Sequence, residues 1–185
     1  YSYWLDHYAK KYHVQIYAYC LMPNHVHFIV IPSDLYGLAR LFNTIHMLYS
    51  QYKNNQNKKK GHLWQGRFSS FPMDERHLFS AVRYVELNPV RAGLVKEPEE
   101  YTWSSAAAHL SGRNDNLVKV SPLLERVGDW RVFLSRDNAQ AFSNKMKCHE
   151  STGRPLGSEN FVVMLEEKLG RTLQCQKPGP KRKAA

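Results

Sequence analysis

Two histidines separated by one residue are the first feature of the sequence that could do chemistry. His25-Val26-His27 lies in the apolar run HVHFIVI, which is typical of a β-strand. Because side chains on a strand alternate between its faces, both imidazoles point to one side and Val26 to the other. Two neutral imidazoles side by side can share a divalent metal ion. The alternative is two polar residues on an ordinary strand face, and a lone His-x-His motif does not decide between them.

A tyrosine and an asparagine four residues apart form the second candidate. Tyr84 and Asn88 fall near the end of an amphipathic stretch over residues 75–87. Residues i and i+4 lie on one face of a helix, and this face is expected to be opposite the apolar stripe of Leu78 and Val82. The phenol would then lie beside an amide oxygen that can ligate a metal. The alternative is a tyrosine that packs against the sheet edge.

The two candidates together describe a reaction. A metal held by two histidines and one amide oxygen keeps open positions, and a phosphate oxygen of DNA could fill one, so that the phosphorus is polarised for attack. Tyr84 would be the nucleophile, and a nearby cation would favour its phenolate. The product would be a covalent phosphotyrosine that keeps the phosphodiester energy, so rejoining needs no nucleotide cofactor. The group that accepts the phenol proton is left open between His77 and water.

The elements that must position these residues are helices and strands in alternation. Helices are expected at the start of the chain and over residues 38–52 and 75–87, and strands over residues 14–20, 25–31 and 63–71. The turn Leu21-Met22-Pro23-Asn24 predicts an antiparallel hairpin between the first two strands. Asp74 is suited to cap the third helix, and Pro89 to open a short helix after it.

The carboxyl-terminal third is less regular. Further helical segments are expected to about residue 142, and residues 143–160 are interpreted as a linker because they are polar and contain Gly and Pro. Cys148-His149-Glu150 has no partner spacing for zinc and is interpreted as part of this linker. A short helix is expected over 161–169, followed by a disordered basic tail. The order of elements predicts the α+β class. One further strand before the first helix would complete a ferredoxin-like antiparallel sheet with helices on one face.

Composition limits the functions that are possible. The 185 residues are 43% hydrophobic and carry a formal net charge of +10, which excludes intrinsic disorder and indicates an anionic partner, most often nucleic acid. The alternative is a basic protein without such a partner. No apolar run approaches the roughly 20 residues that cross a bilayer. Three cysteines without paired spacing favour a reducing cytoplasm.

Four segments in order carry a family resemblance: CLMPNHVHFIVIP, GHLWQGRF, YVELNPVRAGLV and EEYTWSS. They resemble the single-tyrosine, His-hydrophobe-His (HUH) transposases, and most closely the REP-associated tyrosine transposases of bacteria. The resemblance covers residues 14–109 well. TGRPLGSENF and the KPGPKRK end look like the family's carboxyl-terminal extension.

The resemblance implies an activity and a site. It implies that His25, His27 and Asn88 bind Mg²⁺ or Mn²⁺, and that Tyr84 cuts single-stranded DNA to form a 5′-phosphotyrosine. The implied substrates are imperfect palindromic DNA hairpins flanked by short recognition sequences, and the implied setting is the bacterial cytoplasm. The oligomeric state is left open between monomer and dimer.

The resemblance also implies a division of the chain. Residues 1–110 would be the catalytic domain, residues 111–150 a helical extension, and residues 151–185 a carboxyl-terminal helix and basic tail. In the family, a first strand pairs with the histidine strand, and here the chain starts at Tyr1 inside a helix, so we expect that strand to be missing. The open edge predicts poor stability or inactivity, which soluble, monodisperse protein that cleaves DNA would refute.

Other residues of the chain could contact DNA, and other functions could use the same residues. Four basic residues are candidate DNA contacts, with solvent-facing charge as the alternative for each: Lys59, Arg67, Arg83 and Arg91. Trp64 could stack on an unpaired base, although a core position is the simpler interpretation. A hairpin-binding protein without turnover is the competing function. A rolling-circle initiator or relaxase shares the chemistry, but the short chain and the absence of a helicase-like P-loop argue against it.

Overall fold

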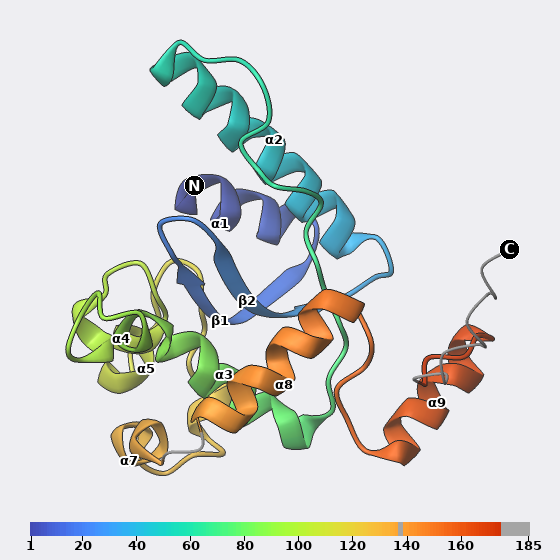
Figure 1. Ribbon diagram of the computed structural model, residues 1–185. Helices are drawn as coiled ribbons and strands as arrows, with labels where there is room; N and C mark the ends of the chain where they lie inside the picture. Colours follow the sequence, from blue (N-terminus) through green and yellow to red (C-terminus); the bar gives the residue numbers. More distant parts are fainter. Residues whose placement is uncertain (137–138, 175–185) are drawn as a thin grey trace, which may run out of the picture.

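The protein has the α+β architecture expected from the sequence, as a computed structural model that describes residues 1–136 and 139–174 shows (Figure 1). In chain order the elements are α1 (Ser2–Lys11), β1 (Val14–Leu21), β2 (Val26–Pro32), α2 (Gly37–Asn57), α3 (Glu75–Glu86), α4 (Asn88–Arg91), a 3₁₀ turn (Pro98–Glu100), α5 (Ala106–Ser111), α6 (Ser121–Leu124), α7 (Trp130–Ser135), α8 (Ala139–Thr152) and α9 (Glu159–Leu169). Within the described residues, the sheet consists of β1 and β2 alone.

The hairpin predicted from Pro23 and Asn24 is confirmed. β1 and β2 are antiparallel, and Cys20 is the partner of His27 in the ladder. A β-bulge interrupts the register between Ile16 and Ala18. An extra residue in one strand locally disturbs the alternation of side chains, and here Tyr17 and Ala18 both belong to the hydrophobic cluster that contains α3.

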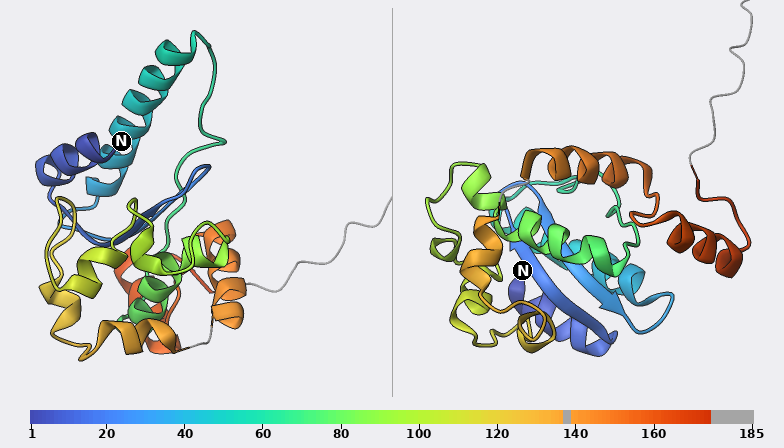
Figure 2. Two further views of the ribbon diagram at one scale, coloured as in Figure 1. Left: turned by 90° about the vertical axis from the view of Figure 1, so that its left-hand side faces the viewer. Right: turned by 90° about the horizontal axis from the view of Figure 1, so that it is seen from below.

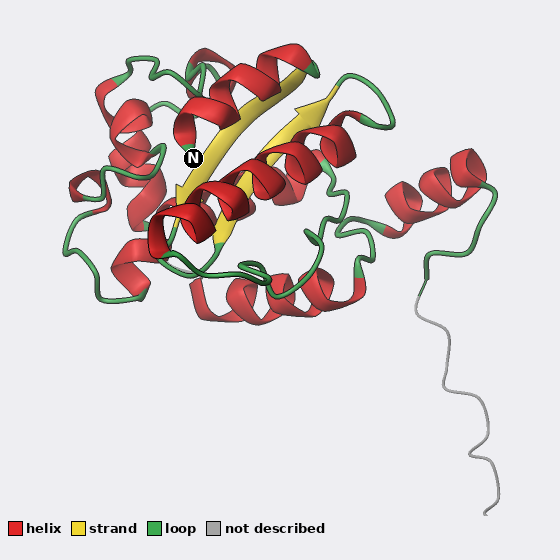
Figure 3. Ribbon diagram, turned by 90° about the horizontal axis from the view of Figure 1, so that it is seen from above, coloured by secondary structure: helices red, strands yellow, loops and turns green. Residues whose placement is uncertain are grey.

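Helices cover both faces of the hairpin, so the expected placement on one face is wrong. Figure 3 shows α1 and α2 over one face, and the right-hand view in Figure 2, seen from below, shows α3 over the other. Each strand carries apolar residues on both sides. Val14, Ile16 and Phe28 pack with α1 and α2, whereas Ala18 and Ile29 pack with α3. A strand that is apolar on both faces needs a cover on each.

The third strand expected over residues 63–71 is absent from the described structure, and this segment is an irregular loop. Its aromatic side chains hold it against α2. The Trp64 ring stacks on the His46 imidazole at 4.1 Å between centroids, and the Phe68 ring lies 5.1 Å from that of Phe42. The four-stranded ferredoxin-like sheet is therefore not formed by the residues that the structure describes.

α3 begins at the predicted cap and is buried on most sides near its end. Asp74 accepts a hydrogen bond from the His77 backbone N–H at 3.0 Å. Pro89 then occupies the first turn of α4, as expected. The last residues of α3 are buried: Ala81, Val82, Tyr84, Val85 and Glu86. A helix covered in this way cannot rotate without breaking contacts on several sides.

The Glu86 carboxylate is fully buried and joins α3 to two later helices. One oxygen, Oε1, is 2.6 Å from both Ser105 Oγ and His109 Nδ1, and Oε2 accepts a hydrogen bond from Trp130 Nε1 at 2.8 Å. His109 also stacks on Trp130 at 4.4 Å between ring centroids. The network uses both oxygens of the acid, which offsets the cost of burying it.

The linker expected over residues 143–160 is wrong in its first part, because α8 continues to Thr152 and packs against α3. The short helix expected over residues 161–169 is confirmed as α9, which Ser158 caps. Much of the basic tail lies outside the described residues. Within the described residues, no helix combines the length and hydrophobicity required to cross a lipid bilayer.

We predict that Glu86→Ala lowers the free energy of unfolding by about 3–5 kcal/mol, because it leaves buried donors without an acceptor. Urea unfolding followed by circular dichroism measures the change. Glu75→Ala is the matched control, since Glu75 is an exposed acid of the same helix that pairs with Arg126 at the surface, and its loss should cost about 1 kcal/mol or less. Equal effects of the two substitutions would contradict the prediction.

Candidate functional site

His25, His27 and Tyr84 meet on the face of the hairpin that α3 covers. The rings of His25 and His27 contact each other edge-on at 4.7 Å between centroids, and the Tyr84 ring lies edge-on to His27 at 5.6 Å. The histidines come from the start of β2 and its preceding turn, and the tyrosine from the last turn of α3. The structure thus brings together residues that are nearly 60 positions apart in the sequence.

The surroundings of the two histidines favour neutral imidazoles. Burial lowers the pKa of His27 to about 4, and the positive charges of His25 and Arg91 act in the same direction. Burial also lowers the pKa of His25. His25 Nδ1 is 2.6 Å from the Asn24 side-chain oxygen, to which it donates. In the neutral ring, Nε2 of His25 then carries the free lone pair that a metal ion requires.

Tyr84 lies in the core and not on an uncovered helix face, so the expectation that its face avoids the core is wrong. Its exposed fraction is 7%. The reason is α8, which contributes Phe142 at 6.4 Å between ring centroids and a hydrogen bond from Ser143. Figure 1 shows α8 beside α3 beneath the sheet.

Opposing charges act on the Tyr84 phenol. Burial raises its pKa, and the negative charge of Glu150 raises it further. The guanidinium of Arg91 and the Ser143 hydrogen bond act in the opposite direction, and the net result is a raised pKa. The phenol is therefore protonated at neutral pH, and additional positive charge is needed to make it a nucleophile.

Asn88 follows Tyr84 by one turn, at the first position of α4. Its amide nitrogen is buried, and no hydrogen-bond partner is found for it among residues 1–136 and 139–174. A buried amide without a partner is costly, and an amide can also turn to present its oxygen. This arrangement leaves the Asn88 amide available to a ligand.

Sequence reasoning missed the contribution of α8. Glu150 Oε1 lies 3.8 Å from His27 Nδ1, and Met146 is buried in the cluster around α3. Phe142, Met146 and Glu150 follow one another at intervals of four, which is a helical signal. The polar residues between them concealed it, and the segment was interpreted as a linker.

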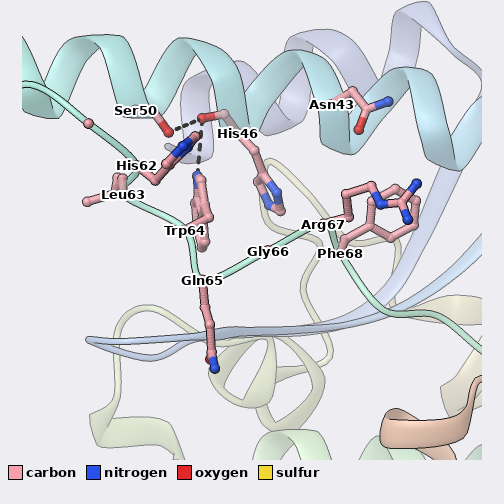
Figure 4. Close-up of a pocket in the computed structure, with 11 residues that line it drawn as sticks. Asn43, His46, Ser50, His62, Leu63, Trp64, Gln65, Gly66, Arg67 and Phe68 are labelled. Carbon is pink, nitrogen blue, oxygen red and sulfur yellow. Dashed lines mark hydrogen bonds between the residues drawn. The ribbon is translucent and has the colours of Figure 1, made fainter.

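A groove of about 1430 Å³ opens beside the histidines. His25, His27 and Tyr17 line it together with the length of β2, the loop 64–73 and Glu150. A second cavity, of about 520 Å³, lies farther along that loop against α2 (Figure 4). There Trp64 Nε1 donates to the His46 carbonyl oxygen at 3.1 Å. The groove and the cavity share His46 and the segment 64–68.

The four basic candidates lie in different surroundings. Arg91 places its guanidinium carbon 4.3 Å from the centre of the Tyr84 ring. Arg67 is exposed and lines the second cavity, against α2. Arg83 turns to α7, where its Nε donates to the Phe133 carbonyl oxygen at 2.9 Å. Lys59 is exposed just beyond the end of α2, which points away from α3 (Figures 1 and 2).

His77, one of the two groups considered for the phenol proton, is engaged at both ring nitrogens. Nδ1 lies 2.6 Å from Asp74 Oδ1, and Nε2 lies 3.1 Å from Lys145 Nζ. It is also seven residues before Tyr84, which is about 10 Å along a helix. His77 therefore forms contacts at the start of α3, with Asp74 and Lys145, and no contact with Tyr84 is found for it among the described residues.

The two imidazoles and the Asn88 amide are candidate ligands for one divalent cation. Among the described residues, no group of three or more His, Cys, Asp or Glu side chains could hold a metal ion. Two neutral imidazoles and an amide form a set of another kind, which offers a divalent cation two ring nitrogens and one amide oxygen. The buried, unpartnered amide of Asn88 is the observation that supports a ligand here.

A comparison with family models gives a match to the first part of the chain. Residues 1–88 match the model described as "Transposase IS200 like", which supports a single-tyrosine transposase family for these residues. The matched stretch contains both histidines, Tyr84 and Asn88. The family points to transposition-type DNA cleavage and rejoining, with DNA as the partner. Searches of curated proteins and of solved structures found no significant match.

We predict that His46, in the cavity of about 520 Å³ against α2, makes the free energy of unfolding depend on pH. Burial lowers its pKa from the ordinary 6.5 to about 4. Between pH 6.5 and pH 4 the unfolded chain is therefore protonated at this imidazole, whereas the folded protein is not. The contribution of His46 to the free energy of unfolding is complete above pH 6.5 and is lost as the pH falls toward 4. Urea unfolding at pH 7 and pH 4.5 should show a larger loss for the wild type than for His46→Gln. Parallel losses would contradict the prediction.

Proposed function

We propose that the protein is a metal-dependent endonuclease and strand transferase that acts on single-stranded DNA hairpins through a 5′-phosphotyrosine intermediate at Tyr84. The observation that carries this proposal is the edge-on contact of Tyr84 with His27, which in turn contacts His25. Two neutral imidazoles can hold a metal ion that polarises a phosphate, and a tyrosine beside them can attack that phosphate. The family of residues 1–88 supports the same reaction.

The reaction balances without an energy-rich cofactor. The Tyr84 oxygen forms a bond to the phosphorus, the bond from phosphorus to the 3′ oxygen of the preceding nucleotide breaks, and that oxygen leaves as a hydroxyl. The phenol loses its proton in this step, and the leaving oxygen gains one. In rejoining, a 3′ hydroxyl attacks the phosphotyrosine and Tyr84 is released. Each step exchanges one phosphodiester for another.

His25, His27 and Asn88 would hold a Mg²⁺ or Mn²⁺ ion. When bound, the ion would polarise the phosphorus and favour the phenolate of Tyr84. Burial lowers the pKa of both imidazoles, so both rings are neutral and have a lone pair for the ion. The ring contact with His27 keeps the Tyr84 ring close to this donor set.

The remaining features of the proposal follow from sequence. REP-type hairpins are the proposed substrates, and the bacterial cytoplasm is the proposed setting. Arg67 and Lys59 are proposed contacts to the DNA backbone, because both are exposed. The divisions after residues 110 and 150, and the choice between monomer and dimer, stay predictions.

We predict that Tyr84→Phe abolishes the covalent adduct. Protein, a labelled single-stranded hairpin and Mn²⁺ are incubated and separated by denaturing electrophoresis, on which wild type should show a protein–DNA band. Tyr12→Phe is the matched control, since the Tyr12 hydroxyl lies near Thr44 of α2, on the face of the hairpin opposite α3, and it should form the adduct at the wild-type level. The loss of one hydroxyl should leave the fold intact in both.

Two outcomes would contradict the proposal. An adduct that persists in Tyr84→Phe would move the nucleophile to another residue. Hairpin binding that is salt-sensitive but indifferent to metal, without any adduct in the wild type, would instead support the non-catalytic binding protein.

We predict that His27→Gln and Asn88→Ala each weaken Mn²⁺ binding about tenfold or more in the absence of DNA. Electron paramagnetic resonance of free Mn²⁺ measures the affinity and does not depend on activity. His7→Gln is the control, because His7 is exposed on α1, over the opposite face of the hairpin. Unchanged affinity in both variants would remove these residues from the ligand set.

A further inference from the structure

Arg91 carries a positive charge in the site that no acid in the described part of the chain neutralises within 4 Å. Its guanidinium lies over the Tyr84 ring, 4.3 Å from the centroid, and its Nη2 donates to the Tyr84 backbone carbonyl. Two contacts to the same residue fix the guanidinium relative to the nucleophile. A stacked, hydrogen-bonded guanidinium loses little entropy when it binds a further group.

The other terminal nitrogen of Arg91, Nη1, has a different environment. It is buried, and no hydrogen-bond partner is found for it within residues 1–136 and 139–174. A buried charged donor without an acceptor is costly. An unsatisfied charged donor on the residue that stacks over Tyr84 is suited to an oxygen atom that carries negative charge.

The charge of Arg91 also reaches both functional partners. It lowers the pKa of the Tyr84 phenol and that of the His27 imidazole. The guanidinium therefore acts on the nucleophile and on one candidate metal ligand together. Arg83 shows the contrast within the same helix region: it is stacked on Phe133 at 4.5 Å and bonded to the Phe133 carbonyl, away from the histidines.

We propose that Arg91 is a catalytic residue whose Nη1 binds a non-bridging oxygen of the scissile phosphate while Tyr84 attacks the phosphorus. This inference rests on the proposed function and adds to it a fixed protein cation. Guanidinium and phosphate form strong, charge-assisted hydrogen bonds. As negative charge accumulates on the phosphate oxygens in the transition state, a donor already in place stabilises it without reorganisation. The same charge stabilises the phenolate.

The test compares Arg91→Gln and Arg91→Lys with the wild type in single-turnover adduct formation with a hairpin oligonucleotide and Mn²⁺. We expect Arg91→Gln to slow the adduct about 100-fold. Arg91→Lys keeps the charge and should recover much of this loss. Two controls accompany them. Arg131→Gln removes an exposed arginine that pairs with Glu99 and should keep the wild-type rate, and Arg83→Gln reports by thermal unfolding what the loss of a stacked guanidinium does to the fold.

A second substrate separates contact with the phosphate from a structural role. A neutral methylphosphonate replaces the scissile phosphate, with the two stereoisomers tested separately. If Arg91 binds the replaced oxygen, the gap between wild type and Arg91→Gln should shrink to about threefold or less for one isomer. An undiminished gap with both isomers, or an equal rate of wild type and Arg91→Gln on normal DNA, would overturn the role of Arg91 alone. No adduct with the wild type would overturn the proposed function and this inference together.

Discussion

The burial of the last turns of α3 is the constraint on which the arrangement of the site depends. The hairpin covers this part of the helix on one side, α8 covers it on another, and the Glu86 network ties it to α5 and α7. Because all these contacts act together, they fix the rotation of α3 about its axis and its position along that axis. The distance of 5.6 Å between the Tyr84 and His27 rings is a consequence of that packing. The fold thus positions a nucleophile by surrounding the helix that carries it.

The local elements around the site could be predicted from the sequence because short-range rules determine them. The hairpin follows from alternating apolar residues and the Pro23-Asn24 turn, and the start of α3 from Asp74. The shared face of His25 and His27 follows from strand geometry alone. That Tyr84 meets His27 depends on how α3 docks on the hairpin, which periodicity does not encode. The resemblance to a known family supplied that step.

The errors have physical causes in packing between segments that are far apart in the sequence. The segment 63–71 has the composition of a strand, but Trp64 and Phe68 pack against α2 and hold its backbone away from regular pairing. The expectation for Tyr84 failed because an apolar stripe was assumed to mark the whole buried surface of α3. The polar residues of α8 concealed the helix that buries the remaining side. Long-range packing decided both cases.

The β-bulge in β1 has a consequence for how such a protein can diversify. It lets Tyr17 and Ala18 both join the cluster around α3, so that one additional aromatic ring lines the groove beside the histidines. Loss of the codon for Tyr17 would restore regular pairing and leave the partners of Cys20 and Leu21 in place. A change in the wall of the groove at Tyr17 therefore does not have to change the register of the histidine strand. A lineage could reshape what the groove accepts while the reactive groups keep their alignment.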